Sequence, residues 1–250
     1  MLIIRALGFQ ESSVAHERTA KNLDIDLIHL PLAIGNSKKE WKSPITGKFE
    51  LVETAVLDYY RNDGWRGYSG EGGLILNLIK AMSFPKVDIG NRSTFIEALY
   101  AQNVAFDEDR FEVDWLLKNV KSATAKQIKN NFGIMASRKP YTIDYGSFST
   151  TNSTSMLDYF PHLESYMFLE LFEALGNDKM LDIAKIFSND PYKYRKGWPD
   201  LTIWKNGEVK FLEVKSPGDR LHSSQKVIIN SFLKPLNLDF SLVDVTIKVG

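Results

Sequence analysis

Two carboxylates and one lysine stand in a pattern that suits phosphate chemistry. Asp200 opens the apolar run Leu201 to Trp204, and Asn206-Gly207 is a strong turn signal before a second run that ends in Glu213-Val214-Lys215. Alternate side chains of a strand share a face, so Glu213 and Lys215 point the same way. The sequence therefore predicts a β-hairpin that brings Asp200 beside Glu213.

Such a hairpin end would suit a hard divalent cation. Carboxylate oxygens and a backbone carbonyl are oxygen ligands of the kind that Mg²⁺ prefers. We expect Asp200, Glu213 and the Val214 carbonyl to bind Mg²⁺ or Mn²⁺. The Lys215 ammonium group can hold a water nucleophile and offset the charge that develops on a phosphate.

Glu71 lies between glycines in Gly70-Glu71-Gly72, directly before the apolar run Leu74 to Ile79. A carboxylate there has a favourable position at the N-terminus of the predicted helix. The residues alone leave two interpretations open, a cap of the first helical turn or an acidic group of the site.

Pro199-Asp200 with Glu213-x-Lys215 resembles the PD-(D/E)xK nuclease signature, and the wider pattern is similar to the VRR-NUC branch of that superfamily. That branch has Gly-x-Pro-Asp-Leu, Glu-Val-Lys, Asp-Arg-Leu and a downstream glutamine. The matching positions here are Gly197 to Leu201, Glu213 to Lys215, Asp219 to Leu221 and Gln225.

The resemblance implies a fold, a role for Glu71 and a substrate. It implies an α/β restriction-endonuclease-like core with a central mixed sheet and an added helical segment. Gly70-Glu71-Gly72 is similar to the Fanconi-associated nucleases of the VRR-NUC group, which makes Glu71 a third acidic group near or on the metal. Those relatives cut branched DNA near 5′ flaps, and this favours flap or junction DNA as the substrate.

Composition is that of an ordinary globular protein, with 44% hydrophobic and 25% charged residues, no cysteine and a formal net charge of zero. Disulfides and thiolate metal sites are thereby excluded. No apolar run approaches the length of a membrane span, so we expect a soluble, cytoplasmic protein.

Positive charge is local. Residues 115–143 carry six Lys or Arg and no acidic residue, which predicts one positive face for a phosphate backbone. The segment 192–196 leads into the hairpin and reads equally as a phosphate clamp with base stacking or as a solvated loop. The candidate DNA contacts are Tyr194, Arg195, Lys196, Arg220, Lys226, Arg138 and Lys139.

Gln225 lies one turn after Leu221 on a helix that we expect to run from an Asp219 cap to about Leu233. From that face its amide could bond a water or a phosphate oxygen. His222 is interpreted as a surface residue.

We expect residues 1–45 to be a segment without chemistry, forming an edge of the fold or a docking surface. Residues 46–250 would form the nuclease domain, with 90–190 as a mostly helical insertion. The elements expected along the chain are strands at 2–7, 25–30 and 240–249, a loop at 147–155, and helices at 15–22, 51–61, 94–105, 107–120, 123–135, 161–175 and 178–187.

The sequence thus predicts a metal-dependent deoxyribonuclease that hydrolyses phosphodiester bonds in branched or flap DNA, with a lean towards a monomer. A dimeric junction resolvase or a restriction or defence endonuclease is the alternative within this class. An inactive nucleic-acid-binding module is the alternative from another class, and it leaves the intact Asp, Glu and Lys set unexplained.

Overall fold

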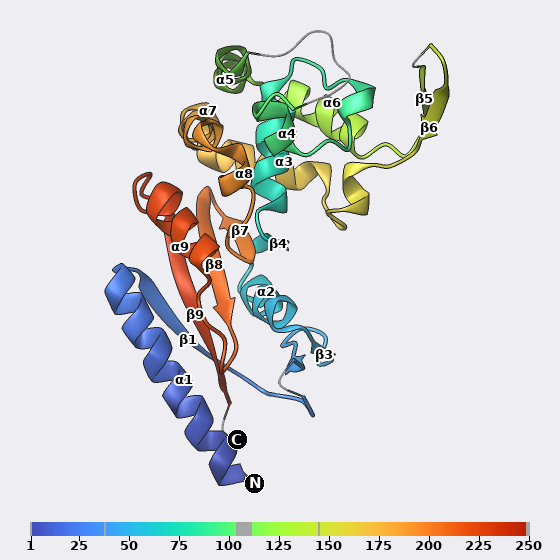
Figure 1. The fold of residues 1–250 in the computed structure, drawn as a ribbon. Helices are drawn as coiled ribbons and strands as arrows, with labels where there is room; N and C mark the ends of the chain where they lie inside the picture. Colours follow the sequence, from blue (N-terminus) through green and yellow to red (C-terminus); the bar gives the residue numbers. More distant parts are fainter. Residues whose placement is uncertain (1, 38, 104–111, 145, 249–250) are drawn as a thin grey trace. The chain divides into compact units, whose positions relative to one another are not determined.

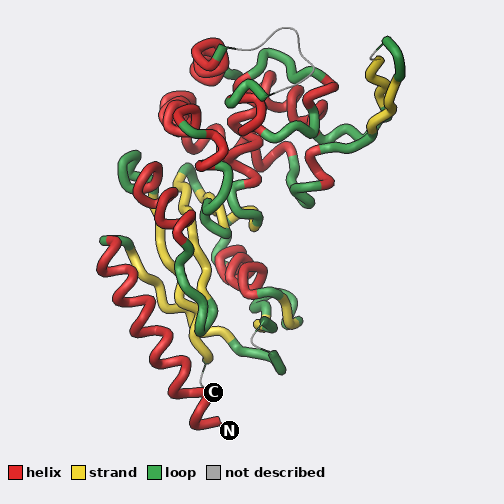
Figure 2. Tube along the Cα trace, in the orientation of Figure 1, coloured by secondary structure: helices red, strands yellow, loops and turns green. Residues whose placement is uncertain are grey.

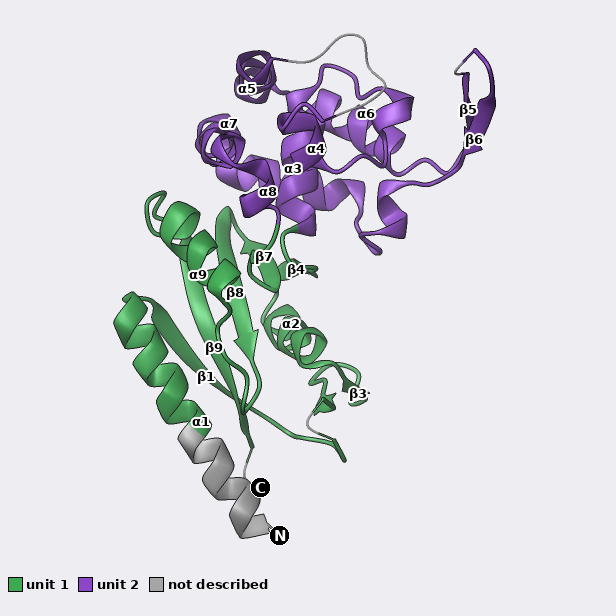
Figure 3. Cartoon of the chain, in the orientation of Figure 1, with its two compact units in different colours: residues 1–72, 196–250 green, residues 73–195 purple. Residues whose placement is uncertain are grey.

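The computed structural model describes residues 2–37, 39–103, 112–144 and 146–248, with the backbone alone for 2–11. The chain folds into two compact units (Figure 3). Residues 1–72 and 196–250 form the first unit, and residues 73–195 form the second.

The predicted hairpin is confirmed. Strands β7 (Leu201–Lys205) and β8 (Glu208–Lys215) pair antiparallel, with Leu201 opposite Leu212. The turn between them has positive φ at Asn206 (52°) and Gly207 (84°), which is the backbone that an Asn-Gly turn adopts at low cost.

The described residues of the first unit form a five-stranded mixed sheet in the order β1-β9-β8-β7-β4 (Figure 1). β9 runs parallel to both β1 and β8, whereas β7 is antiparallel to β8 and β4. The remaining strands of this unit are β1 (Asp26–Leu32), β4 (Arg66–Ser69), β9 (Asp239–Ile247) and the short pair β2 (Trp41–Lys42) and β3 (Phe49–Glu50). The predicted central mixed sheet is confirmed.

The prediction of an antiparallel or edge strand at 240–249 was wrong, and Val249 lies outside the described residues. β9 lies inside the sheet and is parallel to both neighbours. Its polar residues suggested a solvated face, but Ser241 and Asp244, which point to opposite faces of the sheet, are both buried. Asp244 is covered because residues from the N-terminal segment pack over its face of the sheet.

The N-terminal segment supplies that cover. Residues 2–7 were predicted as a strand but belong to helix α1 (Leu2–Leu23), which also contains the helix expected at 15–22. A short apolar run does not distinguish strand from helix by its period. The strand expected at 25–30 is confirmed as β1, which forms an edge of the sheet as one of the two roles expected for residues 1–45.

Helices cover both faces of the sheet (Figures 1 and 2). Helix α2 (Val52–Asn62) packs on the apolar face, where Ala55 and Val56 are fully buried against the sheet. Helix α9 (Ser223–Ile228), continued by the π-helical turn η3 (Ile229–Leu233), lies with α1 on the other face. Asp219 was wrongly predicted as its cap, because the preceding loop extends to His222.

The second unit is mostly helical, with one hairpin in its described residues. Its elements are α3 (Gly73–Ser83), η1 (Ile89–Asn91), α4 (Ile96–Tyr100), α5 (Val113–Ser122), α6 (Ala125–Met135), β5 (Tyr141–Asp144), β6 (Ser149–Asn152), η2 (Met156–Asp158), α7 (Ser165–Asn189) and α8 (Pro191–Tyr194). Residues 104–111, within two predicted helices, lie outside the described residues.

Two expectations for this unit need correction. The loop expected at 147–155 contains β6, whose Thr and Ser side chains suit an exposed strand as well as a loop. The helix expected from Pro161 begins at Ser165. Its predicted break at Gly176 is confirmed by a non-helical φ of 72° and ψ of 170°, after which a second helical stretch continues to Asn189.

No helix in the described ranges is long and apolar enough to cross a membrane.

Candidate active site

The hairpin brings Asp200 and Glu213 together at one end of the first unit's sheet. Asp200 directly precedes Leu201, whose partner Leu212 directly precedes Glu213. The Asp200 Oδ2 atom accepts a 2.8 Å hydrogen bond from the Val214 amide, and the two carboxyl groups also contact each other. The predicted pairing of these carboxylates is present in the structure.

Glu213 is the centre of the polar contacts. Its Oε1 atom accepts a 2.5 Å hydrogen bond from Lys215 Nζ and another from Gln225 Nε2. The Gln225 Oε1 atom accepts from the His222 amide at 2.7 Å, so Gln225 also ties the start of α9 to the site. The side chains of Glu213 and Lys215 are 1% and 8% exposed, and such buried charges require partners.

Burial makes this pair difficult to ionise. Desolvation raises the pKa of Asp200 to about 6, with Glu53 adding to the effect, while the Val214 amide and Lys215 lower it. Desolvation and the charge of Asp200 raise the pKa of Glu213 well above 4.5, although Lys215 works in the opposite direction. When both carboxyl groups are ionised, the pair has more negative charge than Lys215 neutralises, so added positive charge would stabilise the ionised state.

Close packing explains the two glycines that flank the site. A Cβ atom on Gly197 would lie 2.4 Å from the Ser224 backbone at the start of α9, and one on Gly72 would lie 2.6 Å from the Trp198 side chain. Both glycines have positive φ, 88° and 84°. The motif can therefore approach α9 and the β4 turn only with glycine at these positions.

The Glu71 backbone lies next to Asp200. The amide of Gly70 donates a 3.0 Å hydrogen bond to the Asp200 carbonyl, which extends the β4–β7 pairing to the turn that carries Glu71. Glu71 has a positive φ of 38° and an exposed side chain. It lies in the turn before α3 and outside the helix itself.

Glu53 was not identified from the sequence. It lies in the first turn of α2, and its charge contributes to the raised pKa of Asp200. The available signal was its position beside the apolar stripe of a predicted helix, but the sequence did not show which end of the sheet that helix meets.

The carboxylates do not form a complete cage. In the described ranges, no group of three or more His, Asp or Glu side chains is arranged to hold a metal ion. Asp200 and Glu213 thus provide two carboxylates, and the chemistry of Mg²⁺, which keeps several waters, fits such a set.

The predicted phosphate-binding residues lie in both units. Lys196, Arg220 and Lys226 are exposed in the first unit. In the second unit, Arg138 pairs with Asp158 at 2.7 Å, and Arg195 lies 3.5 Å from Glu97 and 5.4 Å from the Tyr192 ring centroid. The other two predicted residues of the second unit are Tyr194 and Lys139. Arg138 and Arg195 would have to exchange these acidic partners for phosphate.

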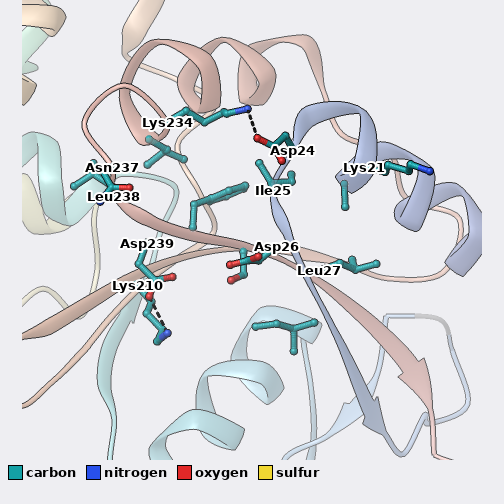
Figure 4. Close-up of a pocket in the computed structure, with 15 residues that line it drawn as sticks. Lys21, Asp24, Ile25, Asp26, Leu27, Lys210, Lys234, Asn237, Leu238 and Asp239 are labelled. Carbon is teal, nitrogen blue, oxygen red and sulfur yellow. Dashed lines mark hydrogen bonds and ion pairs between the residues drawn. The ribbon is translucent and has the colours of Figure 1, made fainter.

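A cavity of about 940 Å³ lies elsewhere in the first unit (Figure 4). It includes Lys210, at the opposite end of β8 from Lys215. Lys210 pairs with Asp239 at 2.8 Å and Lys234 with Asp24 at 3.6 Å. Because these ammonium groups are matched by carboxylates, the cavity is a poor site for a phosphate backbone.

Residues 158–246 match the family model of the VRR-NUC domain. The matched range includes the Gly197–Leu201 and Glu213–Lys215 motifs, and the predicted resemblance to this family is confirmed.

Two relatives that the chain resembles are named as nucleases. The chain is 28% identical to a Fanconi-associated nuclease 1 homolog of Caenorhabditis briggsae over 56% of its own length, and 20% identical to one of Oryza sativa subsp. japonica over 87%. It spans only 14% and 22% of those two proteins.

Solved structures show the same fold. Two crystal structures of paFAN1, bound to 2nt and 1nt 5′-flap DNA with a gap, match with TM-scores of 0.59 and 0.57. Each has 17% sequence identity and covers 90% of this chain and 38% of the other.

Proposed function

We propose that the protein is a metal-dependent DNA nuclease with a PD-(D/E)xK core. The observation that carries the proposal is the contact set of Glu213, whose Oε1 atom binds both Lys215 and Gln225 beside Asp200. A lysine and an amide that converge on a carboxylate pair are suited to phosphodiester hydrolysis. A merely structural salt bridge would leave the second buried carboxylate without a purpose.

The cation would be Mg²⁺ or Mn²⁺, held by Asp200, Glu213 and the Val214 carbonyl, with Glu71 reaching it directly or through water. When bound, it would supply Lewis-acid polarisation of the phosphate and stabilise the leaving oxygen. Protein donors already engage Asp200 Oδ2 and Glu213 Oε1. In this proposal the cation would bind the remaining oxygen of each carboxylate.

The residues of the chain have distinct tasks in this hydrolysis. Lys215 would hold the attacking water and help it to lose its proton to bulk solvent, because the ammonium charge stabilises the hydroxide that forms. That charge also offsets the charge of the phosphate as the new P–O bond forms and the P–O bond to the leaving group breaks. Gln225 orients Glu213 and is placed to bond a water or a phosphate oxygen. Glu53 adds negative charge that strengthens the attraction for a cation.

DNA would be bound through its backbone. In this proposal Lys196, Arg220 and Lys226 are the phosphate contacts of the first unit, and Tyr194, Arg195, Arg138 and Lys139 are those of the second unit. Contacts of this kind position DNA without reading its sequence.

We further propose that catalysis takes place on branched DNA, in a repair role and as a monomer. The support for branched DNA and for a repair role is the similarity to Fanconi-associated nuclease homologs and to paFAN1 crystallised with 5′-flap DNA. In this proposal residues 46–250 form the nuclease domain, and the helical segment 90–190 is an addition to its core.

The direct test compares a 5′-flap duplex, a four-way junction and plain duplex of matched sequence, each end-labelled, in Mg²⁺, Mn²⁺ or EDTA. We expect cleavage of the flap substrate, with a lower rate on plain duplex and none in EDTA. Equal cleavage of all three substrates would refute structure specificity. If no substrate were cleaved in Mg²⁺ or in Mn²⁺, the proposed nuclease activity would be refuted.

Metal affinity should depend on pH, because the cation needs ionised carboxylates. The folded pKa of Asp200 is about 6, and that of Glu213 is also raised. Below about pH 6 each displaced proton should weaken the apparent Mn²⁺ affinity about tenfold per pH unit. Calorimetric titration across this range measures it, and an affinity that does not change with pH would contradict the assignment of these ligands.

A further inference from the structure

A second polar cluster lies on the same sheet face as the carboxylate pair. Asp244, whose side chain is 2% exposed, contacts Ser13 and His16 of α1 and His29 of β1. The distances to the Nδ1 atoms of the two histidines are 2.6 Å for His16 and 3.0 Å for His29. This cluster fixes the N-terminal helix onto strands β9 and β1.

His16 bridges the cluster to the loop that follows Lys215. Its Nδ1 atom donates to Asp244, and its Nε2 atom lies 2.9 Å from the Asp219 carbonyl. Both partners accept hydrogen bonds, so the ring has to donate from both nitrogens, as an imidazolium does. Burial favours the neutral ring, but the hydrogen bonds to Asp244 and Asp219 outweigh it and raise the pKa of His16.

The loop 216–219 is held from two sides. Its own turn is closed by hydrogen bonds from the Ser216 amide to Asp219 Oδ2 and from the Asp219 amide to the Ser216 carbonyl, both 3.0 Å long. Helix α1 adds the His16 contact and a 2.8 Å hydrogen bond from the Gly218 amide to Ser12 Oγ.

This loop connects two parts of the site. It begins directly after Lys215 and leads to α9, whose Gln225 bonds Glu213. Asp244 is the register partner of Lys215 in the β8–β9 pair, and the charge of Lys215 lowers the pKa of His16. A displacement of the loop would therefore move Lys215 and Gln225 relative to Glu213.

We propose that His16 and Asp244 are positioning residues, which hold the 216–219 loop and so set Lys215 and Gln225 around Glu213. This inference rests on the proposed nuclease function and assigns a catalytic purpose to the N-terminal segment. The buried pair acts through the loop and does not touch the substrate. Its effect falls on the chemical step, since a small misplacement of a reacting group lowers rate more than binding.

The test uses His16→Ala in the full chain, with His29→Ala as the matched control. His29 contacts the same Asp244 carboxylate, but its side chain is 46% exposed and its Nε2 atom faces Glu17 of α1 at 3.7 Å. We expect His16→Ala to lower the single-turnover rate on flap DNA about 10- to 100-fold. DNA affinity in EDTA should be unchanged, and His29→Ala should cleave at nearly the wild-type rate.

Hydrogen exchange of the loop amides provides a readout that does not depend on activity. Exchange at Ser216 and Gly218 should accelerate in His16→Ala and remain at the wild-type rate in His29→Ala. Ser12→Ala removes one loop contact without disturbing the buried pair. It should show a smaller effect in the same direction, and it replaces His16→Ala if that variant does not fold.

A coupling measurement separates positioning from general destabilisation. If His16 acts through the loop and α9, the double variant His16→Ala/Gln225→Ala should lose less activation free energy than the two single variants lose together. An inactive wild-type protein would refute the proposed function. If the wild type is active but His16→Ala and Ser12→Ala leave either the loop exchange or the cleavage rate unchanged, this inference alone would be overturned.

Discussion

Lys215→Met should lower the rate of DNA cleavage by about 10² to 10⁴ while leaving DNA affinity nearly unchanged. Methionine keeps most of the length and the apolar stem of the side chain but removes the ammonium group. In the folded protein that group lies 2.5 Å from Glu213 Oε1, at the point where the proposed water and phosphate meet. The loss should therefore appear in the chemical step, measured as a single-turnover rate at saturating DNA.

Lys210→Met is the matched control. Lys210 lies on the same strand but at its other end, where it pairs with Asp239 at 2.8 Å. Its replacement removes the same charge from the same unit and should leave the cleavage rate within a few-fold of the wild type. Similar losses in the two variants would indicate that net charge matters and that Lys215 has no special role.

Asp200→Asn extends the same prediction to the proposed cation ligands. The Asn carbonyl can still accept from the Val214 amide, so the hairpin should keep its geometry. The variant should lose cleavage and bind Mn²⁺ more weakly. Cleavage at the wild-type rate would remove Asp200 from the site.

Local signals were sufficient for the hairpin and its carboxylates. The Asn206-Gly207 turn determines the register, and the register places Asp200 next to Glu213. Each step depends on residues of the same hairpin, where the turn type and the alternation of apolar and polar residues are informative. The polar side of α9 was predictable for the same reason, because Gln225 follows the motif closely in the chain.

Long-range pairing was not accessible in this way. β9 pairs in parallel with β1, whose residues are more than 200 positions earlier. Asp244 thus reads as the polar face of an edge strand until α1 is known to cover it. His16 resembles any solvated histidine until Asp244 and Asp219 are placed around it. The sequence pattern gives the period of each element but not the partner that buries it.

Glu213→Gln should make the metal-free protein more stable while abolishing its response to Mn²⁺. Burial and the charge of Asp200 raise the folded pKa of Glu213 well above 4.5. Above pH 4.5 the folded state then binds more protons than the unfolded state, so the free energy of unfolding falls as pH rises until the folded pKa is passed. Glutamine has no such cost, and its carbonyl oxygen can still accept from Lys215 and Gln225.

Thermal melts in EDTA and in Mn²⁺ measure both effects. In EDTA at pH 8 we expect Glu213→Gln to melt several degrees above the wild type, at about 2–4 °C per kcal/mol. The difference should shrink towards pH 4.5, where both folded and unfolded Glu213 are protonated to a greater extent. Mn²⁺ should raise the melting temperature of the wild type by mass action and leave the variant unchanged.

Glu208→Gln provides the comparison, because Glu208 is exposed at the start of the same strand. It should melt like the wild type in both conditions. If Glu213→Gln instead lowered the melting temperature in EDTA, the ion pair with Lys215 would contribute more to stability than the burial of the second carboxylate costs. Glu213 would then be explained as a structural partner of Lys215. A buried carboxylate that destabilises the metal-free protein indicates a site retained for a cation, and Glu213 would not be such a carboxylate.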